Sequence, residues 1–361
     1  MERKKIVFII PSLTSGGAER VVSILANMLL EFYEVKIILL YKNEAFYSLD
    51  KRINLQYCRL SYNSKSNFFK SITNHIYMVK QVLSFTKGQD IIIGFTTTCN
   101  IYAIISSKLL KIPCIISERI NPIYSVENAF WEKIRKKVYP KSDIIILQTN
   151  SIKDYYRNFI SENKLKVIPN PIDPELQKHI DLNQVKENII LTVGRFTKQK
   201  NHQLLINAFA NIPHKNWKLL IVGDGEEKQA YKELISSLNE EEFIYLIDKT
   251  TQIHREYNKA KIFALTSDYE GFPNVLIEAM SFGVSCISSD CSTGPSDIIE
   301  RNNNGLLFPV NDQNTLETQL IELMNNEELR MMLSKNAVNS VSRLNASNIA
   351  GHWKSIIDEL T

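Results

Sequence analysis

The sequence lacks the features that mark several large classes of protein. Its 361 residues include only 12 glycines and 11 prolines, too few for a collagen-like or low-complexity chain. No apolar run approaches the ~18 residues that a membrane-spanning helix needs. The net charge of +4 is too small to indicate nucleic-acid binding by itself. We therefore expect a globular chain with no nucleic-acid partner and with peripheral membrane contact at most.

The five cysteines exclude a disulfide or zinc framework. They are odd in number, lack CxxC pairs and lie mostly in apolar runs: Cys58, Cys99, Cys114, Cys286 and Cys291. This indicates buried thiols in a reducing cytoplasm. The basic and apolar start resembles a signal peptide, but Pro11 and a Gly-Gly turn follow in place of a cleavage site. We interpret residues 6–10 as a first buried strand.

Apolar runs alternate with amphipathic stretches, which is typical of an α/β protein with parallel sheets. At ~150 residues per domain the length predicts two domains. The expected strands are 6–10, 35–40, 54–58, 90–94, 114–117, 144–147 and 166–168, then 188–193, 218–222, 243–247, 262–265 and 285–288. The expected helices include 18–30, 69–85, 201–210, 226–238, 274–282, 315–324, 327–341 and 346–360.

Three prolines within residues 169–174 predict a stiff, extended connection between the domains. We expect a Rossmann-like domain over 1–173, a second over 174–345, and a cleft between them. The amphipathic helix 346–361 is expected to pack back on the first domain.

The first candidate anion site is the loop that contains Gly16 and Gly17. It follows the first strand and opens a helix, where free N–H groups favour an anion. A plain tight turn is the alternative. The loop is not GxGxxG, and the second strand does not end in an acidic residue, so a dinucleotide-dependent dehydrogenase is poorly supported.

The second candidate is the segment 267–278. Pro273 is expected at the first position of a helix, so that the next amides, of Asn274 and Val275, point at an anion. Glu270 before the helix and Glu278 inside it would hold hydroxyl groups on either side of a diphosphate. The alternative is an acidic loop beside a solvated helical glutamate.

Two further loops add to this pattern. Residues 292–297 repeat the small-residue turn followed by proline, and either line the same site or cap a helix. Arg195 and Lys200, after the strand 188–193, are candidates to neutralise a diphosphate, unless they are ordinary solvated charges.

Five motifs in register resemble retaining GT-B enzymes of glycosyltransferase family 4, over nearly the whole chain. They are residues 16–20, Gly194-Arg195 with Lys200, residues 222–225, Glu270 with Glu278, and residues 304–307. The resemblance implies two Rossmann-like domains facing a central cleft. It also implies a nucleotide-sugar co-substrate, no other cofactor and no metal, in line with the lack of a DxD motif and of a His/Asp cluster.

Carried over by position, the resemblance assigns Glu270, Arg195 and Lys200 to catalysis. Glu270 would contact the donor sugar, and the two cations would stabilise the departing diphosphate. Glu278 would contact the ribose. Donor binding would also use Gly16, Gly17, Gly194, Phe272, Pro273, Asn274 and Val275.

Residues 116–122 and 291–296 resemble the branch that builds capsule, O-antigen and N-glycan precursors on polyprenyl diphosphate. In that branch a basic helix serves the acceptor, and residues 130–139 supply a counterpart. Phe130, Trp131, Ile134 and Val138 would lie on one side of it, and lysines on another. The resemblance thus assigns acceptor binding to Glu118, Arg119, Lys133, Arg135, Lys136 and Lys137. A surface helix with ordinary lysines is the alternative. Arg119 departs from the family, since many members have histidine there.

The sequence therefore predicts a retaining, metal-independent hexosyltransferase on the inner face of the cytoplasmic membrane. It would move a hexose or N-acetylhexosamine, GalNAc first, from a UDP-sugar to a polyprenyl-diphosphate-linked saccharide. The alternatives are a glycerolipid, protein or soluble sugar as acceptor, or a nucleotide-sugar-binding partner without activity.

Overall fold

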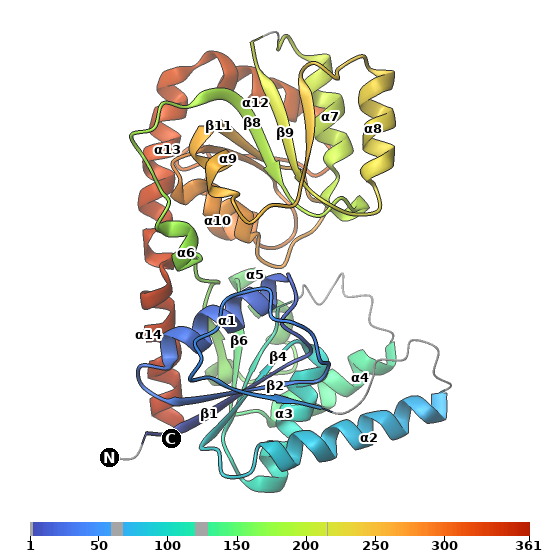
Figure 1. Ribbon diagram of the computed structural model, residues 1–361, viewed down its shortest axis with the longest axis vertical. Helices are drawn as coiled ribbons and strands as arrows, with labels where there is room; N and C mark the ends of the chain where they lie inside the picture. The colour runs from blue at the N-terminus through green and yellow to red at the C-terminus, as the bar shows by residue number, and fades with distance from the viewer. Residues whose placement is uncertain (1–2, 59–67, 120–128, 215) are drawn as a thin grey trace. The chain divides into compact units, whose positions relative to one another are not determined.

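The computed structural model describes residues 3–58, 68–119, 129–214 and 216–361, with the backbone alone at 68–72 and 129–130. The chain forms two compact units, Met1–Pro171 with Ala346–Thr361, and Ile172–Asn345. Each unit contains one parallel β-sheet with helices packed on it (Figure 1). The prediction of two Rossmann-like α/β domains is confirmed.

The sheet of the first unit has seven parallel strands in the order β3-β2-β1-β4-β5-β6-β7. The strands are β1 (Lys5–Ile10), β2 (Glu34–Leu39), β3 (Asn54–Tyr57), β4 (Ile91–Phe95), β5 (Cys114–Ser117), β6 (Ile144–Leu147) and β7 (Leu165–Val167). The helices are α1 (Gly17–Leu29), α2 (Phe68–Phe85), α3 (Thr97–Leu110), α4 (Ala129–Val138), α5 (Asn150–Tyr156) and α14 (Ala346–Leu360).

Helices cover both faces of this first sheet. Val7 of β1 belongs to a core cluster that also contains Tyr102 of α3. On the other face Phe8 packs against Phe95 of β4, and the Phe95 ring stacks on Trp353 of α14 at 5.6 Å. Strands that are buried on both sides explain the continuous apolar runs of the sequence.

The sheet of the second unit has six parallel strands in the order β10-β9-β8-β11-β12-β13. The strands are β8 (Glu187–Val193), β9 (Lys218–Gly223), β10 (Ile244–Asp248), β11 (Ala260–Leu265), β12 (Ser285–Ser289) and β13 (Leu306–Phe308). The helices are α6 (Pro174–Gln177), α7 (His202–Asn211), α8 (Lys228–Ser237), α9 (His254–Lys259), α10 (Asn274–Ser281), α11 (Pro295–Ile298), α12 (Gln313–Asn325) and α13 (Glu327–Val341).

Two expectations need correction. β13 was not among the expected strands, because a run of three apolar residues has no periodicity that separates it from a loop. The connection 169–174 is not extended to its end, since Pro174 begins α6, where the missing N–H of proline costs nothing. All five cysteines are buried and free, as predicted.

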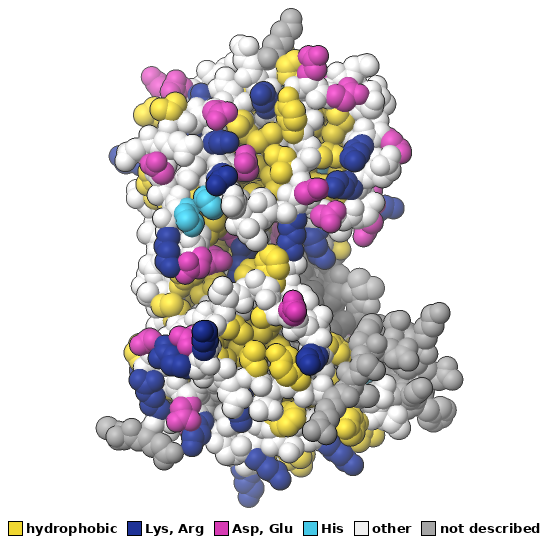
Figure 2. All heavy atoms as spheres, in the orientation of Figure 1, with side chains coloured by type: hydrophobic (Ala, Val, Ile, Leu, Met, Phe, Trp, Pro, Cys, Tyr) yellow, Lys and Arg dark blue, Asp and Glu magenta, His cyan; other side chains and the backbone are white. Residues whose placement is uncertain are grey.

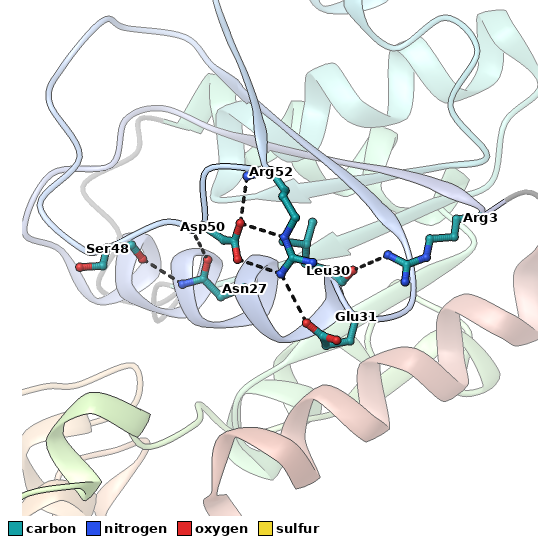
Figure 3. Close-up of polar contacts among 7 residues, drawn as sticks. All are labelled: Arg3, Asn27, Leu30, Glu31, Ser48, Asp50 and Arg52. Carbon is teal, nitrogen blue, oxygen red and sulfur yellow. Dashed lines mark hydrogen bonds and ion pairs between the residues drawn. The ribbon is translucent and has the colours of Figure 1, made fainter.

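A polar cluster fastens the loop before β3 to the end of α1 (Figure 3). Asn27 of α1 donates to the Ser48 carbonyl and accepts from the Asp50 amide, both at 2.9 Å. Arg52 pairs with Asp50 at 2.8 Å and reaches Glu31 at 3.5 Å. These charges are largely exposed, so their pairing adds little to stability, and the cluster belongs to the scaffold.

Charged side chains of both signs are interspersed over the face of the molecule drawn in Figure 2. Among the residues coloured there, Lys and Arg do not gather into one continuous patch. This agrees with the small net charge of the sequence.

Candidate active site

Three loops of the second unit leave the carboxyl ends of neighbouring strands. They follow β8, β11 and β12, which are adjacent in the sheet in that order. Ligands of open parallel sheets bind at this edge. The sequence-predicted site residues from 194 onward lie in these loops and in α10, so the sheet topology brings them to one place.

The loop after β8 carries the two predicted cations. Arg195 is exposed and forms no ion pair with the residues that the structure describes. Lys200 ends a short 3-10 turn (Lys198–Lys200) and is mostly buried. Glycine is required beside this loop, because a Cβ at Gly223 would lie 1.8 Å from the Gly194 carbonyl oxygen.

Lys200 forms an ion pair with Glu270 of the next loop. Its Nζ lies 2.5 Å from Glu270 Oε1, and the two side chains are only 13% and 8% exposed. Ser267 donates a hydrogen bond of 2.7 Å to the same oxygen. Neither residue is therefore a solvated surface charge, and removing one partner would leave the other buried and uncompensated.

Backbone contacts hold the loop between β11 and α10 in place. Gln199 donates from Nε2 to the Tyr269 carbonyl at 2.8 Å and accepts from the Asp268 amide at 2.9 Å. Thr293, in the loop after β12, donates to the Glu270 carbonyl. Glu270 is thus fixed from both neighbouring loops.

The third predicted loop both caps a helix and adjoins the second loop. Gly294 is the N-cap of α11 and has a φ of 96°, a conformation that favours glycine. A Cβ there would lie 2.7 Å from Pro273 Cδ. The two readings of residues 292–297 are therefore compatible.

The start of α10 differs by one residue from the expectation. Pro273 is the N-cap, with ψ of 86°, and Asn274 is the first helical residue. Phe272 is buried, whereas Asn274 and Val275 are half-buried. Amides of a first helical turn have no acceptor within the helix, and the helix dipole favours an anion there. The change of one position leaves this property intact.

Glu278 lies inside α10 and is 3% exposed. The Tyr257 hydroxyl donates to its Oε2 at 3.1 Å. A solvated helical glutamate, the alternative from the sequence, is therefore wrong. A buried carboxylate with an aligned hydroxyl partner can accept further hydrogen bonds from ligand hydroxyl groups.

In the first unit, the predicted glycine pair lies at the start of α1. Gly16 is the N-cap of α1, and Gly17 is exposed. A Cβ at Gly16 would lie 2.0 Å from a carboxylate oxygen of Glu19, so the side chain of Glu19 would have to move. The short residue thus lets this carboxylate approach the start of the helix.

Glu118 follows β5 and is 1% exposed. It accepts hydrogen bonds from the hydroxyls of Tyr139 at 2.8 Å and Tyr156 at 3.4 Å. Burial and the charge of Glu118 raise the pKa of both tyrosines. Both tyrosine hydroxyls therefore keep their protons at neutral pH and donate to Glu118 within the core.

Arg119 is buried against aromatic rings. Its guanidinium lies 4.8 Å from the Phe95 ring centroid and 6.0 Å from that of Trp353, and Nη1 donates to Asn170. Its Nε and Nη2 atoms have no hydrogen-bond partner among the described residues. Burial lowers the pKa of Arg119 to about 9. A buried cation with two unpaired nitrogens is costly to the fold.

Helix α4 presents three lysines to solvent: Lys133, Lys136 and Lys137. Lys136 pairs with Glu132 at 2.8 Å. Arg135, by contrast, is 1% exposed and does not share their face. It follows Trp131 by four residues and precedes Val138 by three, which places it on the apolar side. Phe130 as a side chain, and residues 120–122 of the predicted acceptor motif, lie outside the described residues.

The arrangement in the second unit fits a ligand that carries both negative charge and hydroxyl groups. Two basic side chains, a helix start and two buried carboxylates lie in the loops and in α10 at one sheet edge. In the part of the chain that the structure describes, His, Cys, Asp and Glu do not group in threes as metal ligands would.

The comparisons with known proteins agree with this geometry. Residues 174–340 match the model of "Glycosyl transferases group 1", and residues 15–176 match that of "Glycosyltransferase Family 4". The chain is 33% identical, over 99% of both chains, to an α-1,4-N-acetylgalactosaminyltransferase of Campylobacter jejuni named for an undecaprenyl-diphosphate-linked acceptor. This chain belongs to glycosyltransferase family 4.

A second relative supports this family assignment, and a solved structure supports the fold. It is 31% identical to a second C. jejuni 4-α-N-acetylgalactosaminyltransferase, over 91% of this chain and 92% of that one. HepE of Anabaena, solved with UDP, superposes with a TM-score of 0.82 at 17% identity, over 99% and 100% of the two chains. The predicted GT-B fold and family are confirmed.

Sequence reasoning missed several residues that contact the predicted site residues. Ser267, Tyr257 and Asn170 contact the predicted residues Glu270, Glu278 and Arg119. Ser267 is three residues from Glu270, so its spacing was a usable signal. Nothing in the sequence connects the other two to their partners. No helix within the described ranges is long and apolar enough to cross a membrane.

Proposed function

We propose that this glycosyltransferase moves an N-acetylhexosamine or hexose, with GalNAc as first choice, from a UDP-sugar to a polyprenyl-diphosphate-linked saccharide. Two relatives above 30% identity, both over more than 90% of this chain, are named for such acceptors and for GalNAc transfer. The reaction would retain the anomeric configuration and need no metal, as the family resemblance implies.

The buried Lys200–Glu270 pair is the observation that carries the donor assignment. Lys200 and the exposed Arg195 would hold the diphosphate, and the first-turn amides of Asn274 and Val275 would bind the same oxygens. As the bond between the sugar and the diphosphate breaks, these fixed charges stabilise the leaving group without reorganising. Metal-free catalysis would rest on them.

The two buried glutamates would bind the sugar groups on either side of the diphosphate. Glu270 would accept from donor-sugar hydroxyls, and Glu278, held by Tyr257, from the ribose. Gly16 and Gly17 would leave room for the diphosphate and the acceptor, and Gly194 and Phe272 would shape the walls. An inactive binding protein would have no need to keep both carboxylates and both cations, so we favour an enzyme.

Acceptor binding would fall to the first unit. Glu118 and Arg119 lie at the carboxyl end of β5, and Arg119 has unpaired guanidinium nitrogens there. The lysines of α4 would face the lipid diphosphate or an anionic bilayer, each contributing ~1 kcal/mol near the surface. Arg135 would support the helix from its buried face. Peripheral association with the inner face of the cytoplasmic membrane follows.

The acceptor class is tested by product analysis. Purified protein is incubated with UDP-GalNAc and an undecaprenyl-diphosphate-linked saccharide, and the products are extracted into organic solvent and weighed by mass spectrometry. We expect the lipid product to gain the mass of a HexNAc residue. Transfer only to a glycerolipid, a protein or a free sugar would replace the proposed acceptor with that one.

Membrane association is tested with vesicles that contain anionic phospholipid. A variant with K133Q, K136Q and K137Q should bind them at least fivefold more weakly than the wild type at low salt. The matched control replaces three exposed lysines elsewhere in the first unit, K42Q, K51Q and K111Q. Equal loss in both variants would show a general charge effect and contradict the role of α4.

A further inference from the structure

His202 is a buried polar residue whose hydrogen-bonding capacity is unused. It is the first residue of α7 and is 1% exposed. Neither Nδ1 nor Nε2 has a hydrogen-bond partner among the residues that the structure describes. A buried donor or acceptor that is left unsatisfied destabilises the fold. Such a group in a folded chain needs a physical reason.

The imidazole ring of His202 lies next to the loop that carries Arg195 and Lys200. A Cβ placed on Gly194 would be 3.4 Å from His202 Nε2 and 3.5 Å from Lys200 Cδ. The rings of Phe196 and Tyr231 meet the imidazole edge-on, each with its centroid at 5.8 Å. The backbone at Gly194 is therefore close to Nε2 of His202, and two aromatic rings pack against the imidazole.

The imidazole is neutral, so His202 does not act through a positive charge. Burial, together with the smaller effect of the nearby Lys200 charge, lowers the pKa of His202 to about 3. The backbone of Arg195 and Gly194 is close enough to oppose this shift. Neither backbone group, however, forms a hydrogen bond with the imidazole. A small movement of the loop would complete one.

His214, just beyond the other end of α7, shows how a structural histidine of this domain is satisfied. Its Nδ1 lies 2.6 Å from the Ile212 carbonyl and its Nε2 lies 2.9 Å from Glu240. Its ring also packs against Phe209 at 4.3 Å. If His202 served packing alone, an apolar side chain would fill its site without the penalty of unpaired nitrogens.

We propose that His202 is a positioning residue for the donor-diphosphate loop. When a diphosphate engages Arg195 and Lys200, the backbone at Gly194 settles onto the imidazole, and Nε2–H donates to the Gly194 carbonyl oxygen. The hydrogen bond that is missing in this structure then forms only with bound ligand, so it adds to affinity. This inference rests on the proposed function, because that function places the diphosphate at Arg195 and Lys200.

The test is calorimetric titration of the full chain with UDP, together with its thermal midpoint. H202L should bind UDP at least tenfold more weakly than the wild type, with a midpoint that is unchanged or higher. H202Q, whose amide can reach the position of Nε2, should stay within threefold of the wild type. H202F keeps a planar ring and should behave as H202L, which covers a failure of H202L to fold.

The control H214L should lower the midpoint, because it breaks satisfied contacts, and should leave UDP affinity within twofold. Unchanged UDP affinity in H202L or H202F would overturn the inference while the proposed function stood. Equal weakening in H202Q and H202L with lowered midpoints would show a packing role and also overturn it. If the wild type bound no UDP, the proposed function would fail first and this inference with it.

Discussion

Lys200 Nζ and Glu270 Oε1 lie 2.5 Å apart in the second unit, although the two residues are 70 positions apart in the sequence. Each belongs to a different loop at the carboxyl edge of the sheet. Because both side chains are nearly buried, each charge is compensated mainly by the other rather than by solvent. A diphosphate that engages Lys200 would free the Glu270 carboxylate for a sugar hydroxyl.

Replacing Lys200 and replacing Glu270 are expected to have different effects. Lys200→Met should weaken UDP binding at least tenfold and lower the thermal midpoint, because it leaves Glu270 buried without its cation, at a cost of about 3–5 kcal/mol. Glu270→Gln keeps an acceptor for Ser267 and the site for diphosphate. It should reduce turnover at least a hundredfold and leave UDP affinity within threefold. Normal turnover in Glu270→Gln would remove this residue from the catalytic set.

Tyr257 is expected to act through Glu278. Its hydroxyl donates to Glu278 Oε2 at 3.1 Å, within the core of the second unit. Tyr257→Phe should raise the KM for the nucleotide sugar about three- to tenfold and leave kcat nearly unchanged, because the same binding is lost in the ground state and in the transition state. Steady-state kinetics separate the two constants. A loss confined to kcat would speak against ribose binding by Glu278.

We expect Arg119 to bind the acceptor and to lower the stability of the fold. Burial lowers the pKa of its guanidinium to about 9, so the fold bears a penalty for holding it charged. Arg119→Met should therefore leave the thermal midpoint unchanged or higher, and should raise the KM for the acceptor at least tenfold. The KM for the UDP-sugar should not change. A raised donor KM would move Arg119 to the donor side.

The stability of the second unit should fall in acid partly through His202. Its pKa is about 3 in the folded chain against 6.5 normally. The unfolded chain therefore binds this proton first as the pH falls below 6.5. The free energy of unfolding should decrease by about 1.4 kcal/mol per pH unit between pH 6.5 and 4 from this group. Denaturant titrations of the wild type and H202L should differ by that slope, and identical slopes would refute it.

The fold was predictable because apolar runs define strands that are buried on both faces. β13 was not predicted, because three residues are too few to show a periodic pattern. Helix α4 shows a second limit of sequence analysis. Arg135 has the spacing of the apolar residues and is buried, although the sequence analysis grouped it with the exposed lysines.

The placement of candidate site residues at one sheet edge could be predicted where they share a short motif, as Glu270 and Glu278 do. Partners from distant segments could not be predicted. Trp353 stacks on Phe95 and lies near Arg119, and the three come from α14, β4 and the end of β5. Such contacts depend on tertiary packing, which local sequence patterns do not encode.

The most direct test of the central claim is acceptor-dependent release of UDP by the purified protein in the presence of EDTA. The donors are UDP-GalNAc, UDP-Gal, UDP-GlcNAc and UDP-Glc, each with and without a polyprenyl-diphosphate-linked saccharide. We expect release from UDP-GalNAc above the others, only with acceptor, and unaffected by EDTA. No release from any donor, or release that EDTA abolishes, would contradict a metal-independent UDP-sugar transferase built on Lys200 and Glu270.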